Sequence, residues 1–117
     1  MTAHDAGKRG ERLARKELQS KGYRLLEANW RSGHNELDLI MDDHGTVVFV
    51  EVKARGKNAL GTPAEAVDAS KRRHMTQAAL GYLAAKGLTN APARFDVVEV
   101  YLETGLTRHI VNAFYAQ

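Results

Sequence analysis

The stretch His34–Arg55, HNELDLIMDDHGTVVFVEVKAR, decides how this chain folds. Apolar and polar residues alternate on both sides of the turn-forming segment Asp42–Gly45, which predicts two strands folded back on each other. In that hairpin Asp38, Glu51 and Lys53 share one face. Two carboxylates and a lysine are poor core material, but they suit a divalent metal held against a phosphate. The hairpin therefore carries the candidate site.

The turn also predicts the register of the hairpin. A two-residue loop at His44-Gly45 sets three cross-strand pairs: Asp43 with Thr46, Asp38 with Glu51, and Glu36 with Lys53. Directly opposed Cβ atoms lie roughly 4.5–5.5 Å apart, so two like charges there destabilise a hairpin unless a cation compensates. A slip of one residue would place the two carboxylates on opposite faces. The alternative is a solvent-facing hairpin with a salt bridge, which the apolar Val47 and Phe49 on the Glu51 face disfavour.

The rest of the chain predicts helices and further strands around this hairpin. We expect a helix from about Asp5 to Lys21 that stops at Gly22, followed by a strand Tyr23–Ala28 and a polar connection to Asn35. After the hairpin, a second helical segment should start at Thr62-Pro63-Ala64-Glu65, break near Val67–Ser70 and end at Gly87. Two further strands are expected at Arg94–Leu102 and Arg108–Asn112. Within the hairpin, Leu37, Leu39 and Met41 are expected on one face. The order of helix, three strands, helix and two strands predicts an α/β or α+β sheet with helices packed on it.

The composition and charge of the chain limit the kinds of protein to which it can belong. The chain of 117 residues has a net charge of +3 and no cysteine, so disulfides and thiolate metal sites do not hold it together. Its N-terminus is charged from the start, and its longest hydrocarbon run, Val47–Val50, is far too short to span a membrane. Basic residues cluster in Lys8–Lys16, Lys53–Lys57 and Lys71–Arg73. We expect a soluble, cytoplasmic protein with a polyanionic partner.

Residues on the expected helices leave alternatives open. Glu11 occupies the inner stripe of the first helix, either as part of an acidic site or as an edge glutamate paired with Arg15. Gly7 and Gly10 near that stripe indicate either the close approach of another backbone or a frayed helix start. Cations at positions 71–73 conflict with the helix dipole, which either a phosphate or solvent exposure would relieve. Asp96 is the remaining carboxylate candidate, with a strand-edge position as its alternative.

The acidic residues and their spacing resemble a nuclease signature. Glu11, Asp38 and Glu51-Val52-Lys53 resemble the PD-(D/E)xK superfamily, in which Asp…Glu-x-Lys is the catalytic motif. More narrowly, four segments resemble the bacterial YraN-like family, whose members are inferred to be endonucleases: Gly7-x-x-Gly10-Glu11-x-x-Ala14, Asn29-Trp30-Arg31, Glu36–Ile40 and Phe49–Arg55. The likeness continues through Arg94-Phe95-Asp96-Val97 and covers nearly the whole chain. Asn35 departs from the glycine expected before Glu36, although Asn tolerates left-handed backbone.

The resemblance implies a fold, an activity and a set of site residues. It implies one restriction-endonuclease-like domain over residues 1–117, with a mixed central sheet of about five strands in the order αβββαββ. Asp38, Glu51 and the Val52 carbonyl would hold Mg²⁺ or Mn²⁺, Lys53 would assist catalysis, and Glu11 would complete the acidic site. The substrate would be nucleic acid, with DNA favoured, including branched or damaged DNA.

Basic residues would contact the phosphate backbone of that nucleic acid, and we assign this role to Lys8, Arg12, Arg31, Arg55, Lys57, Lys71 and Arg72. Because one chain carries one site, cutting both strands is simplest as a two-fold dimer, and a monomer would nick one strand. The first alternative function is a catalytically silent nucleic-acid-binding module, which would need cations but not opposed carboxylates. The second is a protein-interaction domain, which would need neither.

Overall fold

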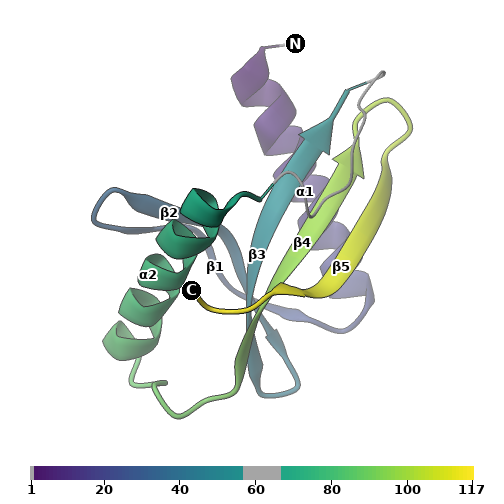
Figure 1. Cartoon of the computed structure of the whole chain (residues 1–117). Coiled ribbons are helices and arrows are strands. Elements are labelled where there is room, and N and C mark those ends of the chain that lie inside the picture. Colours follow the sequence, from purple (N-terminus) through teal and green to yellow (C-terminus); the bar gives the residue numbers. More distant parts are fainter. Residues whose placement is uncertain (1, 57–66) are drawn as a thin grey trace.

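The computed structural model describes residues 2–56 and 67–117 and arranges them as a five-stranded mixed sheet with a helix on each face (Figure 1). The elements in chain order are α1 (Ala3–Ser20), β1 (Arg24–Ser32), β2 (Asn35–Asp43), β3 (Thr46–Arg55), α2 (Ala69–Ala85), β4 (Ala93–Tyr101) and β5 (Leu106–Phe114). The strands lie in sequence order, and all neighbours are antiparallel except the parallel pair β3–β4. The predicted α/β class and element order are confirmed. Neither described helix is long and apolar enough to cross a membrane.

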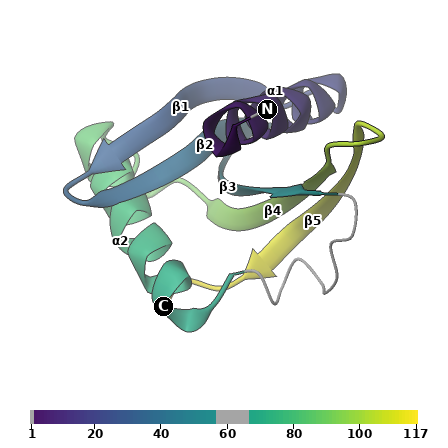
Figure 2. The ribbon, with the colours of Figure 1, turned by 90° about the horizontal axis from the view of Figure 1, so that it is seen from above.

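The sheet buries a separate hydrophobic cluster on each face. Ala14 and Leu18 of α1 pack against one face, on Leu39, Met41, Val48, Val50, Val98 and Val100. Residues of α2 pack against the other face, on a set that includes Leu37, Ile40, Val47, Phe49, Phe95 and Val97. The expectation that Leu37 shares a face with Leu39 and Met41 is therefore wrong. In Figure 2 the β1–β2 hairpin bends away from β3–β5, and this bend changes the alternation along β2.

Local signals account for the helix ends. Thr2 caps α1 through a reciprocal capping box with Asp5, and Gly22 follows the helix with φ of 90°. Asp68 caps α2 by accepting a hydrogen bond from Lys71 N at 2.8 Å, which confirms the predicted helix cap in the segment Val67–Ser70. The predicted helix start at Thr62–Glu65 lies outside the described residues.

The predicted hairpin turn is confirmed, whereas two strand boundaries were wrong. β2 pairs with β3 from Asp43↔Thr46 to Leu39↔Val50 in the expected register. The segment 29–32, interpreted as a loop, continues β1 and pairs with β2 as far as Ser32↔Asn35. Strand β5 is likewise longer than predicted, at Leu106–Phe114. In both cases pairing with a neighbouring strand extends the strand beyond the residues that local propensity indicates.

The two glycines of α1 differ in their surroundings, and this predicts opposite effects of substitution. A Cβ added at Gly10 would lie 3.1 Å from Ala54 Cβ, whereas one at Gly7 would meet nothing within 4 Å. We expect Gly7→Ala to raise the free energy of unfolding by up to about 1 kcal/mol through helix propensity. Gly10→Val should lower it by about 1–3 kcal/mol because it overpacks the contact between α1 and β3. Urea unfolding measures both, and stabilisation by Gly10→Val would contradict the close approach.

Candidate active site

The candidate site lies where β2 separates from β3. The next antiparallel pair after Leu39↔Val50 would be the predicted pair Asp38 with Glu51, but the ladder ends before it. Instead, Val52 N donates to Asp38 Oδ2 at 2.9 Å, while Leu37 packs toward α2. Because a strand residue directs its N–H and C=O to the same side, the Val52 carbonyl also faces this gap. We call Asp38, Glu51, Val52 and Lys53 the notch.

Glu51 is the most deeply buried carboxylate of the notch, with 5% of its surface exposed. Its Oε1 lies 3.8 Å from Lys53 Nζ, and its Oε2 lies 3.4 Å from Lys71 Nζ of α2. Within the described residues, Oε2 is nevertheless a buried atom that accepts no hydrogen bond. A buried carboxylate oxygen without a well-oriented donor is costly, which indicates that a further partner belongs there.

The carboxyl group of Asp38 has a raised pKa. Burial raises the pKa of its carboxyl to about 7, and the neighbouring charges of Glu51 and Glu11 act in the same direction. The Val52 N–H and the charge of Lys71 lower this pKa, but they do not offset the rise. The predicted conflict between the two carboxylates is thus present, although the strands separate before the two residues form a ladder pair.

Glu11 is held beside the notch by a residue that sequence analysis did not single out for the site. Asn29 Nδ2 donates to Glu11 Oε1 at 3.0 Å and to Glu36 Oε1 at 3.3 Å, and Lys8 Nζ donates to Asn29 Oδ1 at 3.3 Å. Asn29 has φ of 52°, a left-handed conformation that Asn adopts more readily than most residues. The ion pair of Glu11 is with Lys8, at 3.9 Å, and not with Arg15 as the alternative interpretation proposed. Asn29 therefore ties α1 to the β1–β2 hairpin.

The predicted pair between Glu36 and Lys53 does not form. Strand β2 pairs with β1 at this point, and Glu36 makes an ion pair with Arg31 at 3.3 Å. Lys53 is instead in register with Glu99 of β4, a carboxylate that is 1% exposed and that sequence analysis missed. Glu99 accepts hydrogen bonds from Arg55 Nε at 2.8 Å and from the Tyr101 hydroxyl. The sequence signal for Glu99 was an acidic residue within the mainly apolar run FDVVEVY. Glu99 is buried because β4 is an interior strand of the sheet.

The donor set of the notch fits a small divalent cation. Mg²⁺ prefers oxygen ligands, is commonly held by one or two carboxylates, and completes its shell with water and substrate phosphate. Asp38, Glu51 and the Val52 carbonyl supply such oxygens. Among them Glu51 Oε2 accepts no hydrogen bond from the described residues, so it is free to bind a cation. Among residues 2–56 and 67–117, no three His, Cys, Asp or Glu side chains gather as a metal cluster. A cation here would therefore depend on the carbonyl, water and phosphate for its remaining ligands.

The predicted nucleic-acid-binding residues fall into different environments. Lys8 and Arg12 line a hollow of about 250 Å³ with Arg15, Glu11 and Asn29. Lys71 contacts Glu51, and Arg72 lies over the Phe114 ring at 5.4 Å. Arg31 and Arg55 are in ion pairs with Glu36 and Glu99, and Lys57 lies outside the described residues. The hollow and Lys71 place basic groups on the α1 side and the α2 side of the notch.

Asp96 is not a strand-edge carboxylate. It has no exposed surface and sits in the interior strand β4. It accepts hydrogen bonds from His109 Nε2 at 2.7 Å, Arg94 Nε at 3.0 Å and Asn112 N at 2.9 Å. Burial by itself would raise the pKa of Asp96, but these hydrogen bonds outweigh it and hold the pKa below 3.8. This satisfied network is structural.

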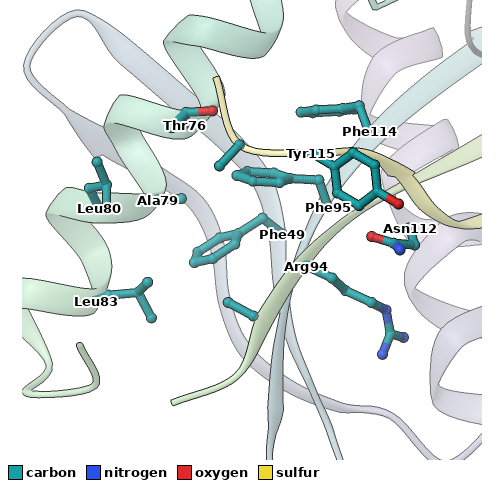
Figure 3. A pocket seen from close by; sticks show the side chains of 12 residues that line it. Phe49, Thr76, Ala79, Leu80, Leu83, Arg94, Phe95, Asn112, Phe114 and Tyr115 are labelled. Carbon is teal, nitrogen blue, oxygen red and sulfur yellow. The ribbon is translucent and has the colours of Figure 1, made fainter. Parts of the chain in front are cut away.

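An apolar pocket lies elsewhere, between α2, β4 and the C-terminal residues (Figure 3). It has a volume of about 160 Å³, and aromatic side chains of Phe49, Phe95 and Phe114 form much of its wall. None of its lining residues is a carboxylate, and its one guanidinium, on Arg94, is hydrogen-bonded to Asp43 and Asp96. The pocket thus offers no carboxylate to a metal, and the notch is the better candidate for chemistry.

Comparisons with known proteins place the chain among bacterial relatives. Residues 10–100 match the model of an uncharacterised protein family, UPF0102. A UPF0102 protein of Symbiobacterium thermophilum is 46% identical over 115 residues, which cover 94% of this chain and 96% of the relative. A UPF0102 protein of Clostridioides difficile is 40% identical over 97% of this chain and 100% of the relative. A UPF0102 protein of Chlorobium chlorochromatii is also 40% identical, over 97% of this chain and 93% of the relative. These names assign no activity.

Proposed function

The chain belongs to the uncharacterised protein family UPF0102, and from its geometry we propose that it is a metal-dependent endonuclease that hydrolyses phosphodiester bonds in nucleic acid. One observation carries the proposal. Glu51 is buried beside a second carboxylate, Asp38, and one of its oxygens has no hydrogen-bond donor among the described residues. A protein that only binds nucleic acid needs cations at its surface, whereas this arrangement needs a cation between two carboxylates.

The chemistry divides among the residues of the notch. Asp38, Glu51 and the Val52 carbonyl would hold Mg²⁺ or Mn²⁺, which when bound would polarise the phosphate and lower the pKa of a water ligand. Lys53 would hold the scissile phosphate or orient the attacking water, whose oxygen forms the new bond to phosphorus. The attacking water gives up one proton to solvent, the phosphorus–oxygen bond to the leaving group breaks, and the leaving oxygen takes up a proton from solvent. Glu11, held by Asn29, would add negative charge beside the cation.

We also propose that the sheet and its two helices form a restriction-endonuclease-like core. The element order αβββαββ and the acidic residues at a strand separation support a restriction-endonuclease-like core of the PD-(D/E)xK type. Basic groups on two sides of the notch, Lys8 and Arg12 near α1 and Lys71 on α2, support a polyanionic substrate, with DNA favoured. A two-fold dimer would let two such sites cut both strands of a duplex, in the cytoplasmic setting expected from the sequence.

Cleavage assays test the proposal. The wild-type chain, Glu51→Ala and Lys53→Ala are incubated with duplex, single-stranded and branched DNA and with RNA, in Mg²⁺, in Mn²⁺ and in EDTA. We expect metal-dependent cleavage of at least one substrate by the wild type, reduced at least about 100-fold in both variants because each removes charge from the reacting phosphate's surroundings. Lys86→Gln, on an exposed pair with Glu27 at 3.7 Å, is the matched control and should cleave like the wild type.

The outcomes separate the proposal from its rival, a catalytically silent nucleic-acid-binding module. The existing contacts of Glu51 with Lys53 and Lys71 favour that rival, because they already neutralise part of the carboxylate's charge. Binding of these substrates without any cleavage would support the rival. Cleavage of equal rate in all variants would identify a contaminating nuclease and would overturn the catalytic assignment.

A further inference from the structure

Lys71 stands out because it contacts the candidate catalytic carboxylate from a different element. Its Nζ lies 3.4 Å from Glu51 Oε2, across the junction between the first turn of α2 and strand β3. The neighbouring Arg72 turns elsewhere: its Nε donates to Val67 O at 2.9 Å, and its guanidinium lies over the Phe114 ring. Lys71 is therefore directed at the notch by its own position, not by the general basicity of the segment.

The location of Lys71 is unfavourable for a cation unless a negative charge lies nearby. It is the third residue after the cap Asp68, and the positive end of the helix dipole disfavours a lysine there. In the described structure Glu51 supplies such a charge at 3.4 Å, besides the cap Asp68 and the nearby Asp38. The contact is not a well-oriented hydrogen bond, because Glu51 Oε2 accepts none within the described residues. The ammonium thus neutralises this oxygen without saturating it.

The charges around the notch indicate how a bound divalent cation would act on Lys71. Without a metal, Lys53 and Lys71 both contact Glu51, and the charge of Lys71 also acts on the second carboxylate of the notch, Asp38. A divalent cation bound by those carboxylates carries the same total charge as the two ammonium groups. It would therefore leave both lysines without their anionic partners, beside the position of the substrate phosphates. The side chain of Lys71 is 39% exposed, so it can reach solvent and substrate.

We propose that Lys71 is an exchangeable counter-ion: it neutralises Glu51 before metal binding and is released to a substrate phosphate when the metal binds. This inference rests on the proposed function. It assigns Lys71 a positioning and binding role that couples metal loading to nucleic-acid affinity. Lys71 competes with the metal when nucleic acid is absent and contacts the phosphate backbone when both are present.

Two binding measurements on the full chain test this role without relying on cleavage. Mn²⁺ affinity is measured by electron paramagnetic resonance in the absence of nucleic acid. Affinity for a short fluorescent DNA duplex is measured by anisotropy in Ca²⁺, which occupies oxygen sites. For Lys71→Met we expect Mn²⁺ affinity at least about 3-fold tighter and duplex affinity at least about 3-fold weaker, since a competing charge and a phosphate contact are both lost. Lys71→Arg should stay closer to the wild type in both measurements.

Lys86→Met is the matched control, because it removes one positive charge from the same helix at an exposed pair with Glu27. It should change neither affinity more than about 2-fold. Unchanged or weaker Mn²⁺ binding by Lys71→Met, with normal binding by the wild type, would overturn the inference and leave the proposed function standing. Equal Mn²⁺ binding by the wild type and Glu51→Gln would overturn both, because the notch would then not be the metal site.

Discussion

Replacing Asp96 with alanine is expected to lower the free energy of unfolding by about 3–5 kcal/mol, which is the usual cost of breaking a buried ion pair. The Asp96 carboxylate is fully buried and accepts from His109, Arg94 and the backbone of Asn112. Lys21 Nζ lies 3.0 Å from His109 Nδ1, and because an ammonium can only donate, His109 carries its proton on Nε2 and donates to Asp96. Alanine leaves these donors buried without their acceptor.

Urea unfolding at neutral pH measures this loss. Glu27→Ala is the control, because the pair of Glu27 with Lys86 is exposed and should be worth no more than about 1 kcal/mol. A similarly small change in Asp96→Ala would show that the network contributes little to stability.

The pH dependence of Asp96 has a definite sign. Because its folded pKa is held below 3.8, the unfolded chain binds this proton more readily than the folded chain. The stability that Asp96 contributes is therefore present above pH 3.8 and is lost as the pH falls through the folded pKa. Asp96→Asn should be less stable than the wild type at neutral pH, and the difference should shrink on acidification below 3.8.

The substitution Asp38→Asn should lower cleavage activity while it raises the stability of the metal-free protein. We expect it to lose at least about 100-fold in metal-dependent cleavage, because it removes one of the two carboxylates that would hold the cation. In EDTA at about pH 8, the same substitution should raise the free energy of unfolding by roughly 1–3 kcal/mol, since it removes a buried charge that faces Glu51. Asparagine Oδ1 can still accept the hydrogen bond from Val52 N, so the local geometry is kept.

The measurements are the cleavage assay and urea unfolding with and without Mn²⁺. Added Mn²⁺ should stabilise the wild type and should stabilise Asp38→Asn much less, because a ligand that binds the folded state alone raises its stability. Asp42→Asn, at a carboxylate paired with the exposed Arg24, provides a comparison in the same strand. A loss of stability in Asp38→Asn in EDTA would mean that the carboxylate is a structural acceptor and not a strained site residue.

Local patterns in the sequence were enough to determine the first helix, the cap of α2 and the turn of the central hairpin. The turn formers around His44-Gly45 set the register of β2 and β3, because a two-residue loop leaves little freedom in strand pairing. Asp68 likewise begins α2 and Gly22 follows the end of α1 where caps were predicted, because capping depends on a few neighbouring residues. Alternation within β3 placed Glu51 and Lys53 on the α2 face.

Tertiary structure decided what surrounds those residues. The separation of β2 from β3, the turning of Leu37 toward α2 and the hydrogen bond from Val52 to Asp38 depend on how the sheet bends between two helices. The contact between Lys71 and Glu51 and the bond between Asn29 and Glu11 join segments far apart in the chain. Burial of Asp96 and Glu99 followed from the interior position of β4, which no local pattern records. Periodicity reports the face of an element, but long-range packing determines which charges meet on it.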